Sequence, residues 1–112
     1  MPYIPGHKEQ DVSKDDRASL DPLIKALVEK VAERSKAYGY DGAFAGQLNY
    51  CVTSLGVGVM KLLFPKIRYW LIALFRGTLR DVGDEFYRRM GAPYEDKAIE
   101  KAGDIDVYME PW

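Results

Sequence analysis

Apolar residues recur at helical spacing in three stretches of this chain, and two strong breaks separate the stretches. The first break is the loop sequence Tyr-Gly-Tyr-Asp-Gly at residues 38–42, and the second is Pro65, which cannot continue a helix. We therefore expect an all-α fold, namely a three-helix domain with a long third helix and extended N- and C-terminal arms. The arms are residues 1–18, which are polar and contain prolines, and residues 98–112.

The first two predicted helices run from about 21 to 37 and from about 43 to 64. Asp21 is a good N-cap, and Pro22 suits the first helical position, where no N–H is needed. Each helix carries an apolar face that is expected to pack: Ile24, Leu27, Val28 and Val31 in the first, and Phe44, Leu48, Cys51, Val52, Leu55, Val59 and Leu62 in the second. Glycines at 46, 56 and 58 each weaken the second helix by about 1 kcal/mol relative to alanine, which indicates close helix approach or a local break near 56–58.

The third predicted helix runs from about 66 to 90, where Gly91 is a suitable stop and Pro93 enforces it. Its apolar side chains wrap most of the helix circumference, and two neighbouring helices offer too little surface to cover them: Tyr69, Trp70, Leu71, Ile72, Leu74 and Phe75. We therefore expect a homo-oligomer whose interface includes Trp70 and Phe75. The aromatic tail, with Tyr108 and Trp112, is expected to dock on the bundle or on a neighbouring subunit.

The size and charge of the chain narrow the function classes. A length of 112 residues is that of one domain, so residues 1–112 are expected to form a single helical domain. Sixteen Lys and Arg against seventeen Asp and Glu leave a net charge of −1. Proteins that bind nucleic-acid polymers need an excess of basic groups, so we exclude a dedicated binder of such polymers.

The longest uncharged stretch, residues 42–60, has roughly the length of a membrane span. It nonetheless contains four glycines and several polar side chains, so we predict no membrane segment: Gln47, Asn49, Thr53 and Ser54. The N-terminal sequence MPYIPGHKEQ lacks the basic-then-apolar pattern of a secretion signal. A single cysteine, Cys51, fits a reducing compartment, and the predicted location is therefore the cytoplasm.

Catalytic and metal-binding groups are sparse in this sequence. His7 is the only histidine and lies in the N-terminal arm, so no general base stands beside a nucleophile on an ordered element. We therefore predict that the protein is not an enzyme, has no catalytic residues and uses no cofactor. The acids near the C-terminus do not follow the spacing of a calcium loop, so no metal site is expected: Glu95, Asp96, Glu100, Asp104 and Asp106.

The charged residues of the third predicted helix are ordered, and two interpretations are open. Asp84 with Arg88, and Glu85 with Arg89, place an acid four residues before a base, which is the spacing of a helical ion pair. Alternatively, four charged residues follow one another every four positions and form a polar seam that suits an anion: Arg76, Arg80, Asp84 and Arg88.

Four segments resemble a family of short uncharacterised proteins found in bacteria, archaea and their phages: MPYI at 1–4, LDP at 20–22, QLNY at 47–50 and EFYRRMGAPYEDKAIEKAGDIDVY at 85–108. The last segment carries the specific pattern FYRRxxAPYEDKxIExxGD, whereas residues 5–18, 36–45 and 56–58 depart from the family. The resemblance implies a helical fold and carries no established activity. Its phage distribution implies a role in the contest between phage and host immunity.

Two functions therefore remain open. The first is a non-catalytic helical oligomer that binds a phosphate-bearing, nucleotide-like anion, as a phage sponge that sequesters an immune signalling nucleotide does. Arginine guanidinium groups bind phosphate through two hydrogen bonds, and tyrosine rings stack on nucleotide bases. We therefore expect these ligand-binding residues: Arg88, Arg89, Tyr87, Tyr94 and Lys97, with Arg76 and Arg80 as further candidates. The second is a protein–protein interaction or assembly protein with no small-molecule ligand. Arginines that converge on a concave pocket favour the first function, and arginines spread along a solvated face favour the second.

Overall fold

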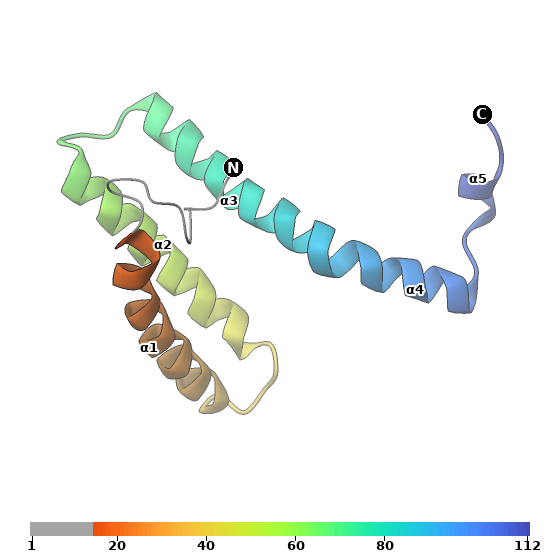
Figure 1. The fold of residues 1–112 in the computed structure, drawn as a ribbon, viewed down its shortest axis with the longest axis horizontal. Helices are drawn as coiled ribbons and strands as arrows, with labels where there is room; N and C mark the ends of the chain where they lie inside the picture. Colours follow the sequence, from red (N-terminus) through yellow and green to blue (C-terminus); the bar gives the residue numbers. More distant parts are fainter. Residues whose placement is uncertain (1–14) are drawn as a thin grey trace. The chain divides into compact units, whose positions relative to one another are not determined.

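The computed structural model describes residues 15–112, and the chain divides into two units, Met1–Leu71 and Ile72–Trp112. The predicted all-α class is confirmed, because no strand occurs in this part of the chain. The helical elements follow one another in this order (Figure 1): α1 (Asp16–Lys36), α2 (Ala43–Leu63), α3 (Tyr69–Phe86), the π-helical turn η2 (Tyr87–Gly91), α4 (Ala92–Ala102) and α5 (Asp106–Met109). The predicted three-helix count is therefore too low. Most of the predicted N-terminal arm, including His7, lies outside the described residues.

The start of α1 differs from the prediction. The helix begins at Asp16, so Pro22 lies inside it and Asp21 is not its N-cap. A proline inside a helix removes one backbone hydrogen bond, here the bond to the Ala18 carbonyl. The residues before Pro22 include the helix formers Arg17 and Ala18, and the acidic Asp16 is favourable in the first turn. These local preferences carry the helix one and a half turns upstream of the proline.

Helix α2 agrees with the prediction to within one residue. It ends at Leu63 because Pro65 forces the preceding residue out of the helical region, and Phe64 is extended at φ −130° and ψ 140°. The expected break at residues 56–58 is wrong, because the helix is continuous from Ala43 to Leu63. Space is open around Gly46 and Gly58, so neither glycine marks a close approach of another element in the described residues.

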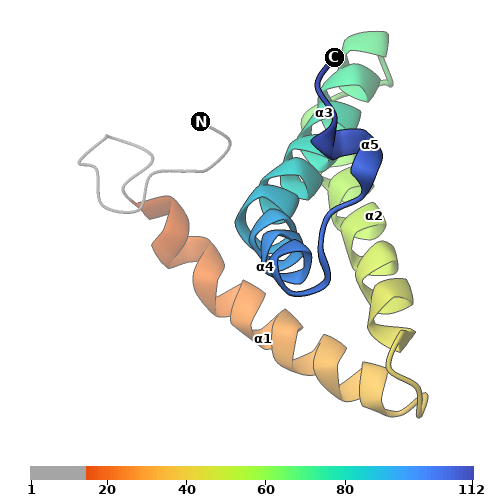
Figure 2. The same ribbon diagram turned by 90° about the vertical axis from the view of Figure 1, so that its right-hand side faces the viewer.

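Helices α1 and α2 form an antiparallel hairpin that contains little buried surface. They contact each other near their short connection, where Gly39 adopts a positive φ of 76°, and they diverge away from it (Figure 2). Ala43, at the start of α2, is the hairpin residue that becomes buried, with 5% of its surface exposed. The apolar faces of the two helices therefore meet at one end and remain open along the rest.

The connection from α2 to α3 holds a small apolar cluster. The rings of Phe64 and Trp70 meet edge to face, with centroids 5.3 Å apart and an interplanar angle of 87°. Leu71 is buried to 4% exposure and lines one small pocket together with Val57 and Met60 of α2. This cluster fixes the first turn of α3 against the end of α2.

In the unit Ile72–Trp112 the chain is helical without interruption from α3 through η2 to α4. The predicted helix stop at Gly91 and Pro93 is therefore wrong. The N–H of Ala92 donates to the carbonyl of Tyr87, five residues earlier, so the helix widens by one residue just before the proline. Pro93 then lies in the first turn of α4, directly after the widened turn.

The predicted C-terminal tail, residues 98–112, is partly helical. Helix α4 continues to Ala102 and ends at Gly103, whose φ of 87° favours glycine, and α5 follows as a single turn. The aromatic side chains of Tyr108 and Trp112 are exposed in this unit. The expected docking of the tail on another surface stays a prediction.

Candidate functional site

The carboxylate of Glu85, near the end of α3, binds two arginines of η2. Its Oε1 atom accepts a hydrogen bond from Arg89 Nε at 2.6 Å and another from Arg88 Nη2, while Oε2 accepts from Arg88 Nε at 3.4 Å. The predicted pair of Asp84 with Arg88 is wrong: Arg88 pairs instead with the acid three residues before it, a spacing that also brings helical side chains together. Both arginine side chains remain exposed, at 67% and 60%.

These two arginines control the titration of Glu85. Their hydrogen bonds favour the charged carboxylate and lower the pKa of Glu85 from 4.5 to about 2. Because the pKa is lower in the folded chain than in the unfolded chain, the stabilisation is present above pH 4.5 and is lost as the pH falls through about 2. The two guanidinium groups therefore share one negative charge throughout the neutral range.

A carbon-detected NMR titration of the side-chain carboxyl groups tests this arrangement. We expect Glu85 to titrate near pH 2 in the unchanged chain and closer to 4.5 in Arg88→Ala and in Arg89→Ala. Arg80→Ala, which alters an arginine of α3 without a hydrogen bond to Glu85, serves as the control and should leave the pKa unchanged. A Glu85 that titrates near 4.5 in the unchanged chain contradicts the shared pairing.

Tyr87, Gly91 and Glu95 form a second local contact across the π-helical turn. The Tyr87 hydroxyl donates to Glu95 Oε2 at 2.9 Å, which raises the pKa of Tyr87 because the bond and the nearby carboxylate disfavour a phenolate. The ring lies over Gly91 so closely that a Cβ there would meet Tyr87 Cδ2 at 2.5 Å. Gly91 thus gives the ring room to cross the turn, rather than ending the helix as predicted.

The structure brings together only some of the seven residues that the sequence nominated. Arg88 and Arg89 both donate hydrogen bonds to Glu85, and Tyr87 donates one to Glu95. The other nominated side chains make no hydrogen bond or ion pair with any described residue: Arg76, Arg80, Tyr94 and Lys97. None of the seven lines one of the grooves described below. The arginines therefore lie along an exposed helix face.

An apolar groove of about 430 Å³ lies between α1 and α2. Helix α1 contributes one wall and α2 the other: Ile24, Leu27, Val28, Val31, Ala32 and Ser35, facing Phe44, Leu48, Cys51, Val52 and Leu55. Ser35 presents no free donor to the groove, because its hydroxyl donates to the Val31 carbonyl at 2.7 Å. The groove is therefore an almost wholly apolar surface.

Sequence reasoning identified both apolar faces but expected them to bury each other, so it missed the groove. Most of the large apolar side chains that line the groove are 42% to 64% exposed, from Val52 to Leu55, whereas Val31 is half-buried. One signal was available: Phe44, Leu48, Cys51 and Leu55 alternate spacings of four and three, the pattern of a helix that packs along its whole length.

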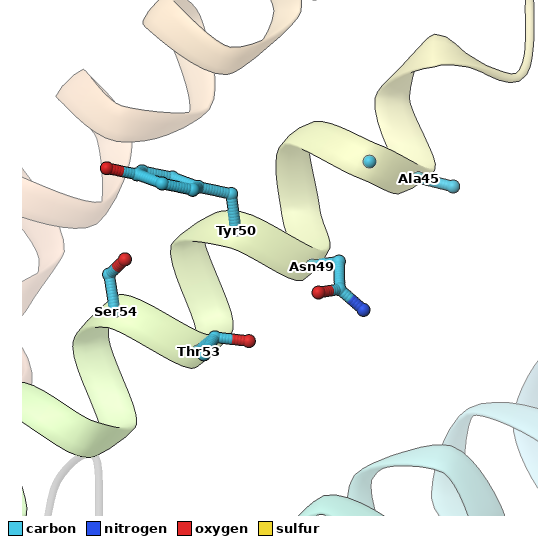
Figure 3. A pocket seen from close by; sticks show the side chains of 6 residues that line it. Ala45, Asn49, Tyr50, Thr53 and Ser54 are labelled. Atoms are coloured by element: carbon cyan, nitrogen blue, oxygen red, sulfur yellow. The ribbon is translucent and has the colours of Figure 1, made fainter.

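A second surface depression lies on α2 alone. It is lined by Ala45, Gly46, Asn49, Tyr50, Thr53 and Ser54. Asn49 and Thr53 project from one side of the helix and Tyr50 and Ser54 from another (Figure 3). No other element supplies a wall, so this depression is a shallow helix surface rather than an enclosed site.

Two further findings concern residues 15–112. No group of three or more His, Cys, Asp or Glu side chains is placed to hold a metal ion in this part of the chain. None of the helices described there is both long and apolar enough to cross a membrane, and this includes α2, which contains most of the uncharged stretch.

Comparison with known proteins supports the resemblance in its general form. A family model described as a domain of unknown function (DUF6899) matches residues 1–105. The chain belongs to this family. The matched range includes the N-terminal MPYI segment and nearly all of the C-terminal FYRR segment on which the resemblance rested. No match was found among curated proteins or among solved structures.

Proposed function

We propose that this member of the DUF6899 family is a non-catalytic assembly protein, which associates with copies of itself through its apolar helix faces. The observation that carries the proposal is the groove between α1 and α2, whose lining is apolar and whose large side chains are about half exposed. Proteins that remain monomeric rarely expose a contiguous apolar surface of more than a few hundred Å². Association removes such a surface from water.

The charged cluster supports this choice over a ligand-binding function. Arg88 and Arg89 are already hydrogen-bonded to Glu85, so an anion must compete with a carboxylate for the same donors. The arginines lie on an exposed face, the arrangement that favours the assembly function. Exposed ion pairs of this kind contribute little to stability, and the pairing of both arginines with Glu85 does not require a ligand.

Size-exclusion chromatography with light scattering tests the proposal. At micromolar concentration we expect a dimer or larger species, and the predicted involvement of Trp70 and Phe75 makes Phe75→Glu a suitable weakening variant. Phe75→Glu is preferable to Trp70→Glu, because Trp70 also supports the turn through Phe64. A monomeric mass for the unchanged chain, with no response to Phe75→Glu, excludes self-assembly.

A second candidate function is the binding of a phosphate-bearing small molecule, such as a cyclic nucleotide that a phage sponge sequesters. One observation favours it: two guanidinium groups, those of Arg88 and Arg89, lie on the same short helical turn as Tyr87 and both bind Glu85. A hydrogen bond to a charged group contributes about 1.5–3 kcal/mol, so two new bonds to phosphate are sufficient for measurable affinity.

Calorimetry against cyclic di- and trinucleotides and ADP-ribose derivatives tests this second function. A true site should bind one of these anions more tightly than about millimolar, and Arg88→Ala and Arg89→Ala should each weaken binding about tenfold or more. Arg34→Ala, which alters an exposed arginine of α1 outside the seven candidate residues, serves as the control. If no anion binds, or if Arg34→Ala weakens binding as much as the other two, the assembly function stands alone.

A further inference from the structure

The groove of the hairpin is suited to bind another helix. Helices α1 and α2 diverge away from the loop (Figure 2), and the groove between them is open. On α2, the groove residues Phe44, Leu48, Cys51 and Leu55 keep the alternating spacing of a helix seam. An amphipathic helix with anchors at the same spacing is the occupant that such a groove accepts.

Helix α3 presents a face of this kind. Leu71, Phe75, Thr78 and Val82 follow one another at spacings of four, three and four, and positions 74 and 79 on their flank are also leucines. Leu74 and Val82 are 62% and 63% exposed. The opposite side of α3 is polar and carries Arg80 and Asp84. A single apolar stripe therefore runs along α3, and beyond the buried Leu71 it includes exposed side chains such as Val82.

We propose that α3 of a second copy lies in the α1–α2 groove, and that the two copies exchange this helix reciprocally. The proposal rests on the proposed assembly function and names the surfaces that perform it. Each copy then supplies one groove and one helix, which is the self-complementary arrangement of a twofold dimer.

The turn between α2 and α3 favours a second copy over the same chain. Leu71 lines its pocket with Val57 and Met60, which follow Leu48 and Cys51 by nine residues each. Nine residues at about 100° each amount to two and a half turns, so Val57 and Met60 lie on the side of α2 opposite the groove. The first turn of α3 is thus held away from its own groove.

The charges of the two partners are complementary. Residues 15–71 carry eight Lys and Arg against six Asp and Glu, a net charge of +2, and Lys61 is the one charged side chain of α2. Residues 72–112 carry six Lys and Arg against nine Asp and Glu, a net charge of −3. Contact between the first segment of one copy and the second segment of the other brings opposite net charges together, whereas two hairpins facing each other join like charges.

Reciprocal exchange removes the exposed apolar side chains of two grooves and two helices from water. The helical run from α3 to α4 is also roughly 50 Å long, against roughly 30 Å for α1 or α2, so it spans a whole groove.

Cys51 provides a direct test, because it is the only cysteine of the chain, is free, and lines the groove. In Phe75→Cys, Thr78→Cys and Val82→Cys, a second thiol is placed on the apolar stripe of α3. Mild oxidation of the full chain should join two chains through Cys51 and the introduced thiol, and denaturing electrophoresis with peptide mass spectrometry identifies the bond. Arg80→Cys, on the polar side of α3, is the matched control and should give at least tenfold less of this product.

The outcomes separate this inference from the proposed function. A bond from Cys51 to the stripe within one chain overturns the exchange, and so does a dimer of the unchanged chain linked through Cys51 to Cys51, which indicates facing hairpins. If the chain is oligomeric by light scattering but none of the three variants cross-links, the groove has another occupant and only self-assembly survives. If the chain is monomeric, both the inference and the proposed function fail.

Discussion

Leu48→Glu should convert the assembly into monomers. Leu48 lies in the middle of the α2 wall of the groove and is 46% exposed in the single chain, so the substitution places a carboxylate where association buries apolar surface. Burying that charge without a partner costs about 3 kcal/mol or more at each interface, which raises Kd by roughly 100-fold or more. Sedimentation equilibrium over a range of concentrations measures the shift.

Thr53→Glu is the matched control for this substitution. It introduces the same charge into the same helix, five residues further along, but on the side turned away from the groove. Thr53→Glu should therefore leave Kd within a few-fold of the unchanged chain, and circular dichroism should show that both variants remain helical. Equal weakening by the two variants contradicts a specific role of the groove.

Leu71→Ala should produce the largest loss of folding stability among single truncations in this chain. Leu71 is the buried leucine of the described residues, with 4% exposure, and its side chain lines the pocket beneath the turn between α2 and α3. Truncating a buried leucine removes apolar contacts and leaves a cavity, which costs about 2–5 kcal/mol. Urea unfolding, followed by circular dichroism at equal protein concentrations, measures this loss.

Leu62→Ala is the comparison for Leu71→Ala. Leu62 lies near the same end of α2 but is 90% exposed, so its truncation should change the free energy of unfolding by about 0.5 kcal/mol or less. If the two variants unfold at the same urea concentration, the turn cluster does not hold α3 against α2. The anchoring step of the helix exchange then loses its support.

The sequence predicted the helices best where a break has a single physical cause. Pro65 ends α2 within one residue of the predicted position, because a proline excludes the helical conformation of the residue before it. The predicted start of α1 was wrong, because a proline such as Pro22 also occurs inside a helix when the neighbouring residues favour helix formation. The predicted helix end before Pro93 was also wrong, because the π-helical turn contains one extra residue, and this local geometry has no clear sequence signal.

The candidate site was less predictable than the fold. The sequence indicated that Arg88 and Arg89 lie near an acid, but the sharing of Glu85 by both depends on side-chain geometry along a widened turn. The groove depends on the divergence of α1 and α2, which periodicity does not encode. Periodicity reports that a helix has an apolar face, and it does not say whether that face is covered by the same chain or by another.

A native mass spectrum of the full wild-type chain tests self-association. At micromolar concentration we expect the dominant species to have a mass that is a whole multiple of the 12.7 kDa chain, twofold or higher. Dilution should return it to the single chain with an unchanged mass. A spectrum that shows only the 12.7 kDa monomer at concentrations up to about 100 μM excludes self-association, because a micromolar Kd would produce oligomers at that concentration.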